Sequence, residues 1–360
     1  MDKYIDYYND SKKVTYHEQT DISNILKLRA VLKTLPDFCK DYFRAMDPLT
    51  TTKTRISYAY DIRIFFQFLL DENPAFKDYS MKDFTVDVLD QLKAIDIEEY
   101  QEYLKVYKNG DKTETNGERG LKRKISALRS FYAYYYKHEF IQTNPTVLVD
   151  VPKTHEKNII RLDADEVAML LDHIEHCGDE LTGQKRVYYE KTKERDLAIV
   201  TLLLGTGIRV SECVGLDIED VDFKNNGIKV TRKGGNEMVV YFGYEVEKAL
   251  KKYLEVRKNI VPVAGHEHAL FYSTQRKRIG IQAVENLVKK YAGAITTTKK
   301  ITPHKLRSTY GTTLYQETGD IYLVADVLGH RDVNTTKKHY AAMDDARRRK
   351  AATAVHLRED

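Results

Sequence analysis

The C-terminal stretch, residues 301–343, constrains the fold more than any other part of the chain. Thr302 and Pro303 predict a helix start, because a threonine hydroxyl can cap free amides and the proline ring already has a helical φ. His304 and Arg307 follow at a spacing of three, so they share one face of that helix. The stretch therefore places an imidazole and a guanidinium together in the first helical turns.

A second helical pattern, residues 321–328, leads into two further polar side chains. Gly329 predicts its end, His330 stands on the break, and Tyr340 follows in a new segment. A planar guanidinium matches two phosphate oxygens, and an imidazole can move a proton near neutral pH. A tyrosine oxygen can attack phosphorus and be held as an ester. This set of groups suits a phosphate diester better than other common substrates.

A second cluster lies upstream, in LGTGIRVSECVGL and VTRKGGNE. Arg209 comes just after a Gly-Thr-Gly turn, and Glu212 stands where it can hold that arginine in place. Lys233 lies near the tip of a predicted hairpin, residues 227–242, where apolar side chains alternate. Taken singly, each histidine could be an ordinary surface or core group, and Lys233 an ordinary hairpin-tip lysine.

The order G-x-G-x-R-x-S-E-x-x-x-L, K-G-G, H-x-x-R, L-G-H, Y resembles the tyrosine recombinase (phage integrase) family over residues from about 50 to 343. The resemblance implies these catalytic residues: Arg209, Lys233, His304, Arg307, His330 and Tyr340. It implies that the arginines clamp the scissile phosphate, that the histidines hydrogen-bond or move a proton, and that the lysine protonates the leaving 5′ oxygen. Tyr340 would attack and form a 3′-phosphotyrosine, with no metal or nucleotide cofactor.

Two positions depart from the family pattern. The second lysine often found in the hairpin tip is Asn236 here. The usual T-T-x-x-Y spacing is one residue longer, so that His339 occupies the position of the nucleophile. Tyr340 is the only tyrosine after His330 and is kept as the predicted nucleophile.

The length of 360 residues allows two domains, and 42% apolar residues favour a globular chain. The net charge of +4 does not by itself indicate a nucleic-acid ligand. Cys39, Cys177 and Cys213 are scattered, which fits a reducing compartment. Without a signal peptide or an apolar run long enough for a membrane span, we expect a cytoplasmic protein, and the resemblance implies that it is nucleoid-associated.

The predicted fold class is mainly α with a small β-hairpin, and the resemblance implies a two-domain C-shaped clamp. We predict a lead-in with a helix (1–46), a helical core-binding domain (47–150), a linker (151–158), the catalytic domain (159–343) and a tail (344–360). Pro36 should interrupt the lead-in helix. The polar segment 109–120 predicts a loop, and 179–193 predicts an exposed insertion or an extended helix. The resemblance implies that the tail is an exchange helix donated to a neighbouring protomer; a frayed basic tail is the alternative.

Clusters of basic residues on helices near loops can neutralise DNA phosphates, although such clusters are often only solvated faces. We predict DNA contacts from these residues: Lys53, Arg55, Lys122, Arg123, Lys124, Arg129, Arg276, Lys277 and Arg278. His266 and His268 form an H-x-H without further ligands nearby, so no metal site is predicted.

The predicted function is a site-specific DNA recombinase of the Xer type, serving chromosome dimer resolution or DNA inversion and excision. The alternatives are a mobile-element or prophage integrase and, less favoured, an accessory DNA-binding protein without catalysis. A type IB topoisomerase shares the chemistry, but the short helical N-terminal domain and the tail argue for recombination. The predicted partners are double-stranded DNA with a specific site, further copies of the chain in a tetramer, and an accessory protein, but no membrane.

Overall fold

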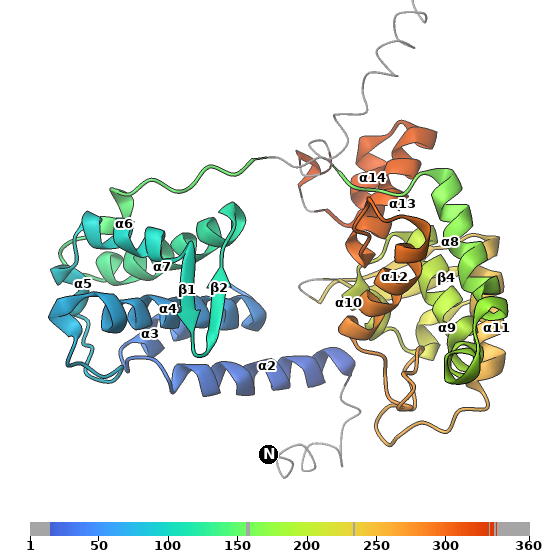
Figure 1. Cartoon of the computed structure of the whole chain (residues 1–360), viewed down its shortest axis with the longest axis horizontal. Helices are drawn as coiled ribbons and strands as arrows, with labels where there is room; N and C mark the ends of the chain where they lie inside the picture. The colour runs from blue at the N-terminus through green and yellow to red at the C-terminus, as the bar shows by residue number, and fades with distance from the viewer. Residues whose placement is uncertain (1–14, 156–158, 233–234, 331, 335, 337–360) are drawn as a thin grey trace, which may run out of the picture. The chain divides into compact units, whose positions relative to one another are not determined.

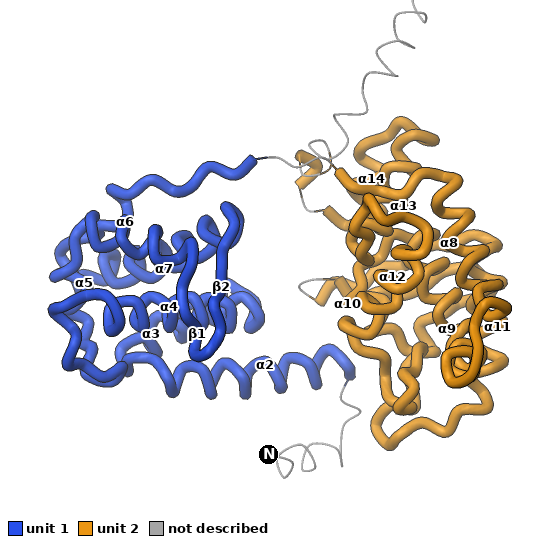
Figure 2. The backbone as a smooth tube through the Cα atoms, viewed as in Figure 1, with its two compact units in different colours: residues 1–157 blue, residues 158–360 orange. Residues whose placement is uncertain are grey.

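The computed structural model describes residues 15–155, 159–232, 235–330, 332–334 and 336. The chain divides into two compact units, Met1–Lys157 and Asn158–Asp360, and the division falls in the segment where the sequence predicts a linker (Figure 2). Each unit has its own core and is described by itself. None of the helices in these described ranges combines the length and apolar character that a bilayer crossing requires.

The first unit is a helical domain with one small hairpin (Figure 1). Its elements are α2 (Tyr16–Leu32), α3 (Cys39–Ala45), α4 (Thr52–Glu72), η1 (Pro74–Phe76), α5 (Val88–Gln91), α6 (Ala94–Tyr103), β1 (Val106–Asn109), β2 (Lys112–Thr115), α7 (Glu118–Lys137) and η2 (Pro145–Val147). Helix α4 lies at the centre and packs against α2, α6 and α7. Thr51 caps its start, because the Thr51 hydroxyl accepts from the Thr54 amide at 3.3 Å.

An aromatic core holds these helices together. Helix α7 contributes these buried apolar side chains: Leu121, Ile125, Leu128, Phe131 and Tyr135. The Phe131 ring lies 5.2 Å from the Tyr42 ring and 6.2 Å from the Phe66 ring, both edge-on. Edge-to-face contacts of this kind add to the free energy gained by burying the rings. The core thus joins α3, α4 and α7.

Two parts of the first unit test sequence predictions directly. The break at Pro36 is confirmed, because α2 ends at Leu32 and α3 begins at Cys39. The predicted loop 109–120 is wrong at its start, where β1 and β2 pair as an antiparallel hairpin. Gly110 has a φ of 62° at the first position of the two-residue turn, a conformation that glycine adopts without steric cost. The strands are polar and lack apolar alternation, so the sequence pattern did not predict the hairpin.

The second unit is a helical bundle with a three-stranded antiparallel sheet (Figure 1). Its elements are α8 (Ala164–His176), η3 (Cys177–Glu180), α9 (Gly183–Thr206), α10 (Val210–Gly215), η4 (Ile218–Asp220), β3 (Val221–Asp222), β4 (Gly227–Thr231), β5 (Glu237–Tyr241), α11 (Tyr244–Arg257), α12 (Ile281–Ile295), α13 (Pro303–Thr318) and α14 (Ile321–Leu328). Helix α9 is central and packs against α8, α11, α12 and α13. The polar segment 179–193 resolves as an extended helix, because most of it forms the first half of α9.

The predicted hairpin 227–242 is confirmed as β4 and β5, with Ile228 opposite Val240. The sheet gains a short edge strand, β3, which sequence periodicity did not indicate. Alternation places Ile228, Val230 and Val240 in the core, as expected for a sheet with one buried face. Strand β4 ends at Thr231, and Arg232 is the next residue.

Helices α13 and α14 form the predicted pair. Pro303 is the first residue of α13, and Thr302 precedes it in extended conformation. Asp320 caps α14 by accepting from the amides of Tyr322 and Leu323. Gly329 ends α14 with a φ of 62°, as the glycine predicts. Gly329 thus sets the end of α14, whereas Thr302 makes no side-chain hydrogen bond at the start of α13, where Pro303 favours the helical backbone instead.

Candidate active site

The turn after α9 positions Arg209. Gly207 ends α9 with a φ of 64°, and Arg209 then occupies the position before the first turn of α10. A methyl group at position 207 would lie 2.3 Å from Cδ1 of Tyr310 and 2.9 Å from Cδ2 of Leu328. Glycine is therefore needed here for two reasons, the left-handed backbone and the close approach of α13 and α14. This packing brings Arg209 to the end of α14.

Glu212 holds Arg209 at two points. Its Oε2 accepts from the Arg209 backbone amide at 2.8 Å, and its Oε1 accepts from Nη1 of the same residue at 2.8 Å. The Glu212 side chain is 3% exposed, whereas that of Arg209 is 36% exposed. The predicted support of Arg209 by Glu212 thus has a geometric basis: a buried carboxylate fixes the arginine, whose guanidinium still reaches the surface.

Arg307 is buried, 5% exposed, and ties two other segments together. Its Nη1 donates to the Gly207 carbonyl at 2.5 Å, and its Nη2 donates to the Leu328 carbonyl. These acceptors belong to the ends of α9 and α14. The two predicted arginines are therefore brought to the same place by the packing of α9, α13 and α14.

Three consecutive carbonyls at the end of α14 each accept from a different arginine. Arg232 Nη2 donates to Val327 at 2.6 Å, Arg307 Nη2 donates to Leu328, and Arg209 Nη2 donates to Gly329 at 3.2 Å. Carbonyls in the last turn of a helix lack partners within the helix and carry partial negative charge. The partial negative charge at the end of α14 therefore stabilises the three guanidinium groups gathered there.

His330 follows directly and is held by the same helix end. Its backbone amide donates to the Ala325 carbonyl at 2.9 Å, and its Nδ1 lies 2.7 Å from the hydroxyl of Thr336. Thr336 is fully buried. A partner on Nδ1 orients the ring and leaves Nε2 as the other polar atom of the imidazole. Thr336 thus orients the His330 ring, although the sequence pattern indicated this residue only through its spacing to Tyr340.

The remaining predicted catalytic residues are placed differently. His304 lies in the first turn of α13, exposed, one turn before Arg307. Lys233 and Tyr340 lie outside the described residues. The structure therefore brings together Arg209, Arg307 and His330, while the positions of the lysine and the tyrosine stay predictions.

The electrostatics of the cluster come from closely spaced cations around one buried acid. Burial lowers the pKa of Arg232; Glu212 opposes this shift and Arg209 adds to it. An arginine whose pKa is lowered in this way is still a cation at neutral pH. A surface with Arg209 exposed beside two further guanidinium groups is suited to an anion with several oxygens, such as a phosphate diester.

Five of the predicted DNA contacts are exposed basic side chains. They are Lys53, Lys122, Arg123, Arg276 and Lys277. Arg123 also pairs with the buried carboxylate of Asp61. These residues stay predictions for phosphate contact.

The other four predicted DNA contacts have partners inside the protein, which favours a structural role for them. Lys124 is 6% exposed and lies 3.7 Å from Asp61, so its side chain faces the core. Arg129 donates to the carbonyls of Thr146 and Val149. Arg55 pairs with Asp47, with 12% of its side chain exposed.

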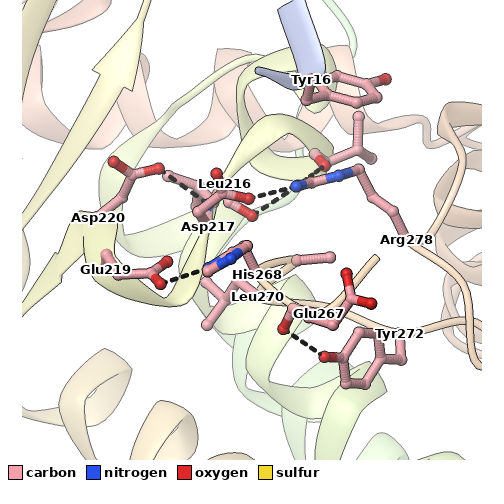
Figure 3. Close-up of polar contacts among 12 residues, drawn as sticks. Tyr16, Leu216, Asp217, Glu219, Asp220, Glu267, His268, Leu270, Tyr272 and Arg278 are labelled. Carbon is pink, nitrogen blue, oxygen red and sulfur yellow. Dashed lines mark hydrogen bonds and ion pairs between the residues drawn. The ribbon is translucent and has the colours of Figure 1, made fainter. Parts of the chain in front are cut away.

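Arg278 is the fourth of these residues. It pairs with Asp217 and donates to the Leu216 carbonyl at 2.8 Å, fixing the segment after α10 (Figure 3). Nearby, His268 Nδ1 lies 2.5 Å from Glu219 Oε1 (Figure 3). Across the part of the chain that the structure describes, no group of three or more potential metal-binding side chains is found.

Sequence reasoning missed two residues of the cluster, Arg232 and Thr336. Arg232 directly precedes the predicted lysine, and the sequence of a polar hairpin tip does not indicate which segment a basic side chain contacts. Thr336 is the second residue of a Thr-Thr pair, and its side chain is buried. Only the folding of α14 back toward the sheet and the α9 turn reveals their partners.

The sequence matches the phage integrase family over residues 160–347. It is 33% identical over 315 residues to tyrosine recombinase XerC of Caldanaerobacter subterraneus subsp. tengcongensis, covering 84% of this chain and 82% of that protein. It is 31% identical over 338 residues to tyrosine recombinase XerS of Lactococcus lactis subsp. cremoris, covering 88% of this chain and 93% of that protein.

The fold is similar to those of solved integrases and recombinases. One is the Tn1549 transposon integrase in complex with circular intermediate DNA, with a TM-score of 0.60 at 21% identity over 84% of this chain and 94% of that chain. Another is the XerH recombinase bound to its difH substrate, with a TM-score of 0.58 at 20% identity over 84% of this chain and 78% of that chain.

Proposed function

This chain belongs to the phage integrase family and is a tyrosine site-specific recombinase; we propose that it cuts and rejoins double-stranded DNA through a 3′-phosphotyrosine on Tyr340. The observation that carries the proposal is the convergence of Arg209 and Arg307, from separate helices, at the turn that bears His330. A phosphate in transfer needs preorganised cations on its non-bridging oxygens, and two arginines fixed by the fold supply them.

The proposed step begins with attack of the Tyr340 oxygen on phosphorus. A bond forms between that oxygen and phosphorus, and the bond from phosphorus to the 5′ oxygen breaks. The phenolic proton passes to a histidine or to water, and Lys233 gives a proton to the leaving 5′ oxygen. Since the ester retains the energy of the phosphodiester, a 5′ hydroxyl of the partner duplex can reverse the step without a nucleotide cofactor.

The arginines would act during this step by stabilising negative charge. Arg209 has a fixed backbone and a partly exposed guanidinium, so it can take a phosphate oxygen while Glu212 holds it. Arg307 is anchored by two carbonyls and would contribute a fixed charge from within the protein. A tyrosine has an ordinary pKa of about 10. Two neighbouring cations favour its ionised form.

The histidines would complete the site. His330 is oriented through Nδ1 by Thr336, so Nε2 is the nitrogen proposed to face the phosphate. His304 lies one turn before Arg307 in α13 and is exposed, which suits a contact with a bound strand. Both imidazoles can donate a hydrogen bond or relay the nucleophile's proton near neutral pH.

The proposed DNA contacts are the exposed basic residues Lys53, Lys122, Arg123, Arg276 and Lys277. Each phosphate contact would release bound counterions and give binding a salt dependence. We also propose, as the sequence predicts, that the two domains close on the duplex, that four copies assemble on DNA, and that segment 344–360 is exchanged between protomers. A cytoplasmic protein acting at the nucleoid fits this function.

An Xer-type role is the preferred biological setting. The relatives at 30% identity or more that are described above carry the names XerC and XerS. Structural likeness at 21% identity to a transposon integrase concerns the fold alone. Chromosome dimer resolution or DNA inversion and excision are therefore proposed ahead of integration of a mobile element.

The test is covalent capture. Duplexes that the protein selects from a random pool would be nicked beside the cleavage position, so that the cut is not reversed, and then incubated with wild type and Tyr340→Phe. Wild type should form a protein–DNA adduct that survives EDTA, whereas the variant should bind the duplex and form none. An adduct that persists in Tyr340→Phe would reject this tyrosine as the nucleophile, and magnesium-dependent cutting without an adduct would reject the proposed chemistry.

A further inference from the structure

We propose that Arg232 is a positioning residue of this recombinase: it fastens the tip of the β4–β5 hairpin to the end of α14, and so sets where Lys233 acts. The inference rests on the proposed function, because it concerns the delivery of the proton to the leaving 5′ oxygen. Arg232 makes two kinds of contact, one through its backbone to the hairpin and one through its side chain to α14.

The backbone of Arg232 closes the hairpin tip from one side. Its amide donates to the Asn236 carbonyl at 2.7 Å, and its carbonyl accepts from the Gly235 amide at 3.0 Å. Both bonds span the position of Lys233. A displacement of Arg232 should therefore also displace the short loop that contains Lys233, the proposed general acid.

The side chain of Arg232 reaches across to another segment of the fold. Its Nη2 donates to the Val327 carbonyl at 2.6 Å, and its Nη1 lies 3.5 Å from the Asp326 carbonyl. These carbonyls come almost a hundred residues later in the chain. The hydrogen bonds join the hairpin to the same helix end that holds Arg209 and Arg307.

Gly329 makes room for this contact. A methyl group at position 329 would lie 1.2 Å from Nη1 of Arg232, so the guanidinium lies directly against the glycine backbone. Gly329 also has a φ of 62°, which ends the helix. That backbone conformation alone does not explain why the Arg232 guanidinium lies so close to it. The L-G-H turn is thus shaped to receive the arginine as well as to end α14.

Arg232 is less suited than Arg209 to hold the phosphate itself. Its Nη2 is engaged by Val327, and its Nε is enclosed without a hydrogen-bond partner among the described residues. Arg209, by contrast, is fixed by Glu212 and has 36% of its side chain exposed. Arg232 therefore acts on the reaction through the place of the hairpin, where a displacement of about 1 Å can cost on the order of 100-fold in rate.

The experiment compares Arg232→Ala, Lys233→Ala and wild type on two versions of one selected duplex. One version carries an ordinary phosphodiester, and the other has sulfur in place of the bridging 5′ oxygen, a leaving group that needs no proton. We expect Arg232→Ala to form the adduct about 10- to 100-fold more slowly on oxygen and to recover to within a few-fold of wild type on sulfur. Duplex binding should be unchanged.

Lys229→Ala is the matched control, because Lys229 is an exposed cation on β4, the strand that precedes Arg232, and pairs with Asp220 and Glu237 rather than with α14. It should behave as wild type on both substrates. Wild-type rates for Arg232→Ala on oxygen, a defect of equal size on sulfur, or loss of duplex binding would each overturn the positioning role.

A double-mutant cycle keeps the inference testable if Arg232→Ala is unstable. Gly329→Ala should displace the arginine in the wild-type background but meet no guanidinium once Arg232 is alanine. On the oxygen substrate, the double variant should therefore lose less rate than the product of the two single fold-losses. A loss equal to that product would overturn the inference. Absence of any Tyr340-dependent adduct with wild type, or of sulfur rescue in Lys233→Ala, would instead count against the proposed function.

Discussion

The almost fully buried carboxylate of Glu212 accepts hydrogen bonds from both the backbone amide and the guanidinium of Arg209, each at 2.8 Å. The arginine is thereby fixed in direction before any substrate arrives. A catalytic cation that needs no reordering during the reaction is worth more than a mobile one. The value of this pair can be measured separately from DNA binding.

We expect Glu212→Gln to slow adduct formation by on the order of 10- to 100-fold, because a hydrogen bond to a charged group contributes about 1.5–3 kcal/mol. Duplex binding should be little changed, since other residues provide the phosphate contacts. Single-turnover rates on the nicked duplex measure the effect. Glu219→Gln is the matched control, because Glu219 is an exposed glutamate whose partner is His268, and its rate should stay at the wild-type value.

The hydroxyl of Thr336 gives a second prediction. Thr336→Val keeps the shape of the buried side chain but removes the partner of His330 Nδ1. A neutral hydrogen bond contributes about 1 kcal/mol, so adduct formation should fall about fivefold. Thr336→Ser retains a hydroxyl and should stay near wild type. If the valine variant reacts as fast as the serine variant, the contact does not orient the imidazole.

The salt dependence of DNA binding distinguishes exposed from buried lysines on α7. Lys122 is exposed and should contact phosphate, so Lys122→Ala should lower the slope of log K against log salt by about 1. Lys124→Ala should leave the slope unchanged and destabilise the first domain by about 3 kcal/mol, because it leaves Asp61 with one partner fewer. Titrations at several salt concentrations and urea unfolding measure the two effects. A change of slope in Lys124→Ala would contradict its structural role.

These contacts show how far sequence patterns reach in this protein. Helix ends were predictable where a local signal decides them, as at Gly207 and Gly329, because capping depends on neighbouring residues. The β1–β2 hairpin was not, because its strands are polar and its only signal was the turn at Gly110.

The site divides in the same way. Motif order pointed to Arg209, Arg307 and His330, and the structure shows why they meet. The roles of Arg232 and Thr336 depend on contacts with α14 and with His330 that no local pattern encodes. Lys124 followed the basic pattern of α7, yet its position on the helix places it against the buried Asp61. Charge alone does not tell which basic residue faces the core.

Alkaline pH should destabilise the protein through its buried tyrosines. Burial raises the pKa of Tyr253 and of Tyr103 to about 12, and it raises the pKa of Tyr132 and Tyr291 as well. An unfolded chain loses these protons near pH 10, whereas the folded chain retains them. The unfolded state therefore binds fewer protons above pH 10, so the free energy of unfolding falls as pH rises from about 10 toward 12.

Urea unfolding between pH 8 and 12, followed together with tyrosinate absorbance, measures this effect. Stability should be level with respect to these groups below pH 10 and should fall above it. Tyr253→Phe removes one such group, together with the hydroxyl that accepts from the Tyr272 amide. This variant should show a shallower alkaline decline than wild type, and an equal decline would exclude Tyr253 from the effect.

Gly207 and Gly265 form a natural pair for measuring the packing of the site. Both have a left-handed backbone, with φ of 64° and 84°, and both lie in the second unit. A methyl group at position 265 would meet nothing within 4 Å, whereas one at 207 would collide with Tyr310 and Leu328. Gly265→Ala therefore measures the backbone cost alone, about 1 kcal/mol. Gly207→Ala adds the cost of the collision, about 1–3 kcal/mol.

We expect Gly207→Ala to lower the free energy of unfolding of the second domain by about 2–4 kcal/mol, against about 1 kcal/mol for Gly265→Ala. Since the Gly207 carbonyl accepts from Arg307, the first variant should also slow adduct formation, while the second should leave the rate unchanged. Urea unfolding and single-turnover rates give the two readings. Equal loss of stability in both variants would mean that α13 and α14 can yield at this contact, and the turn after α9 would then not set the position of Arg307.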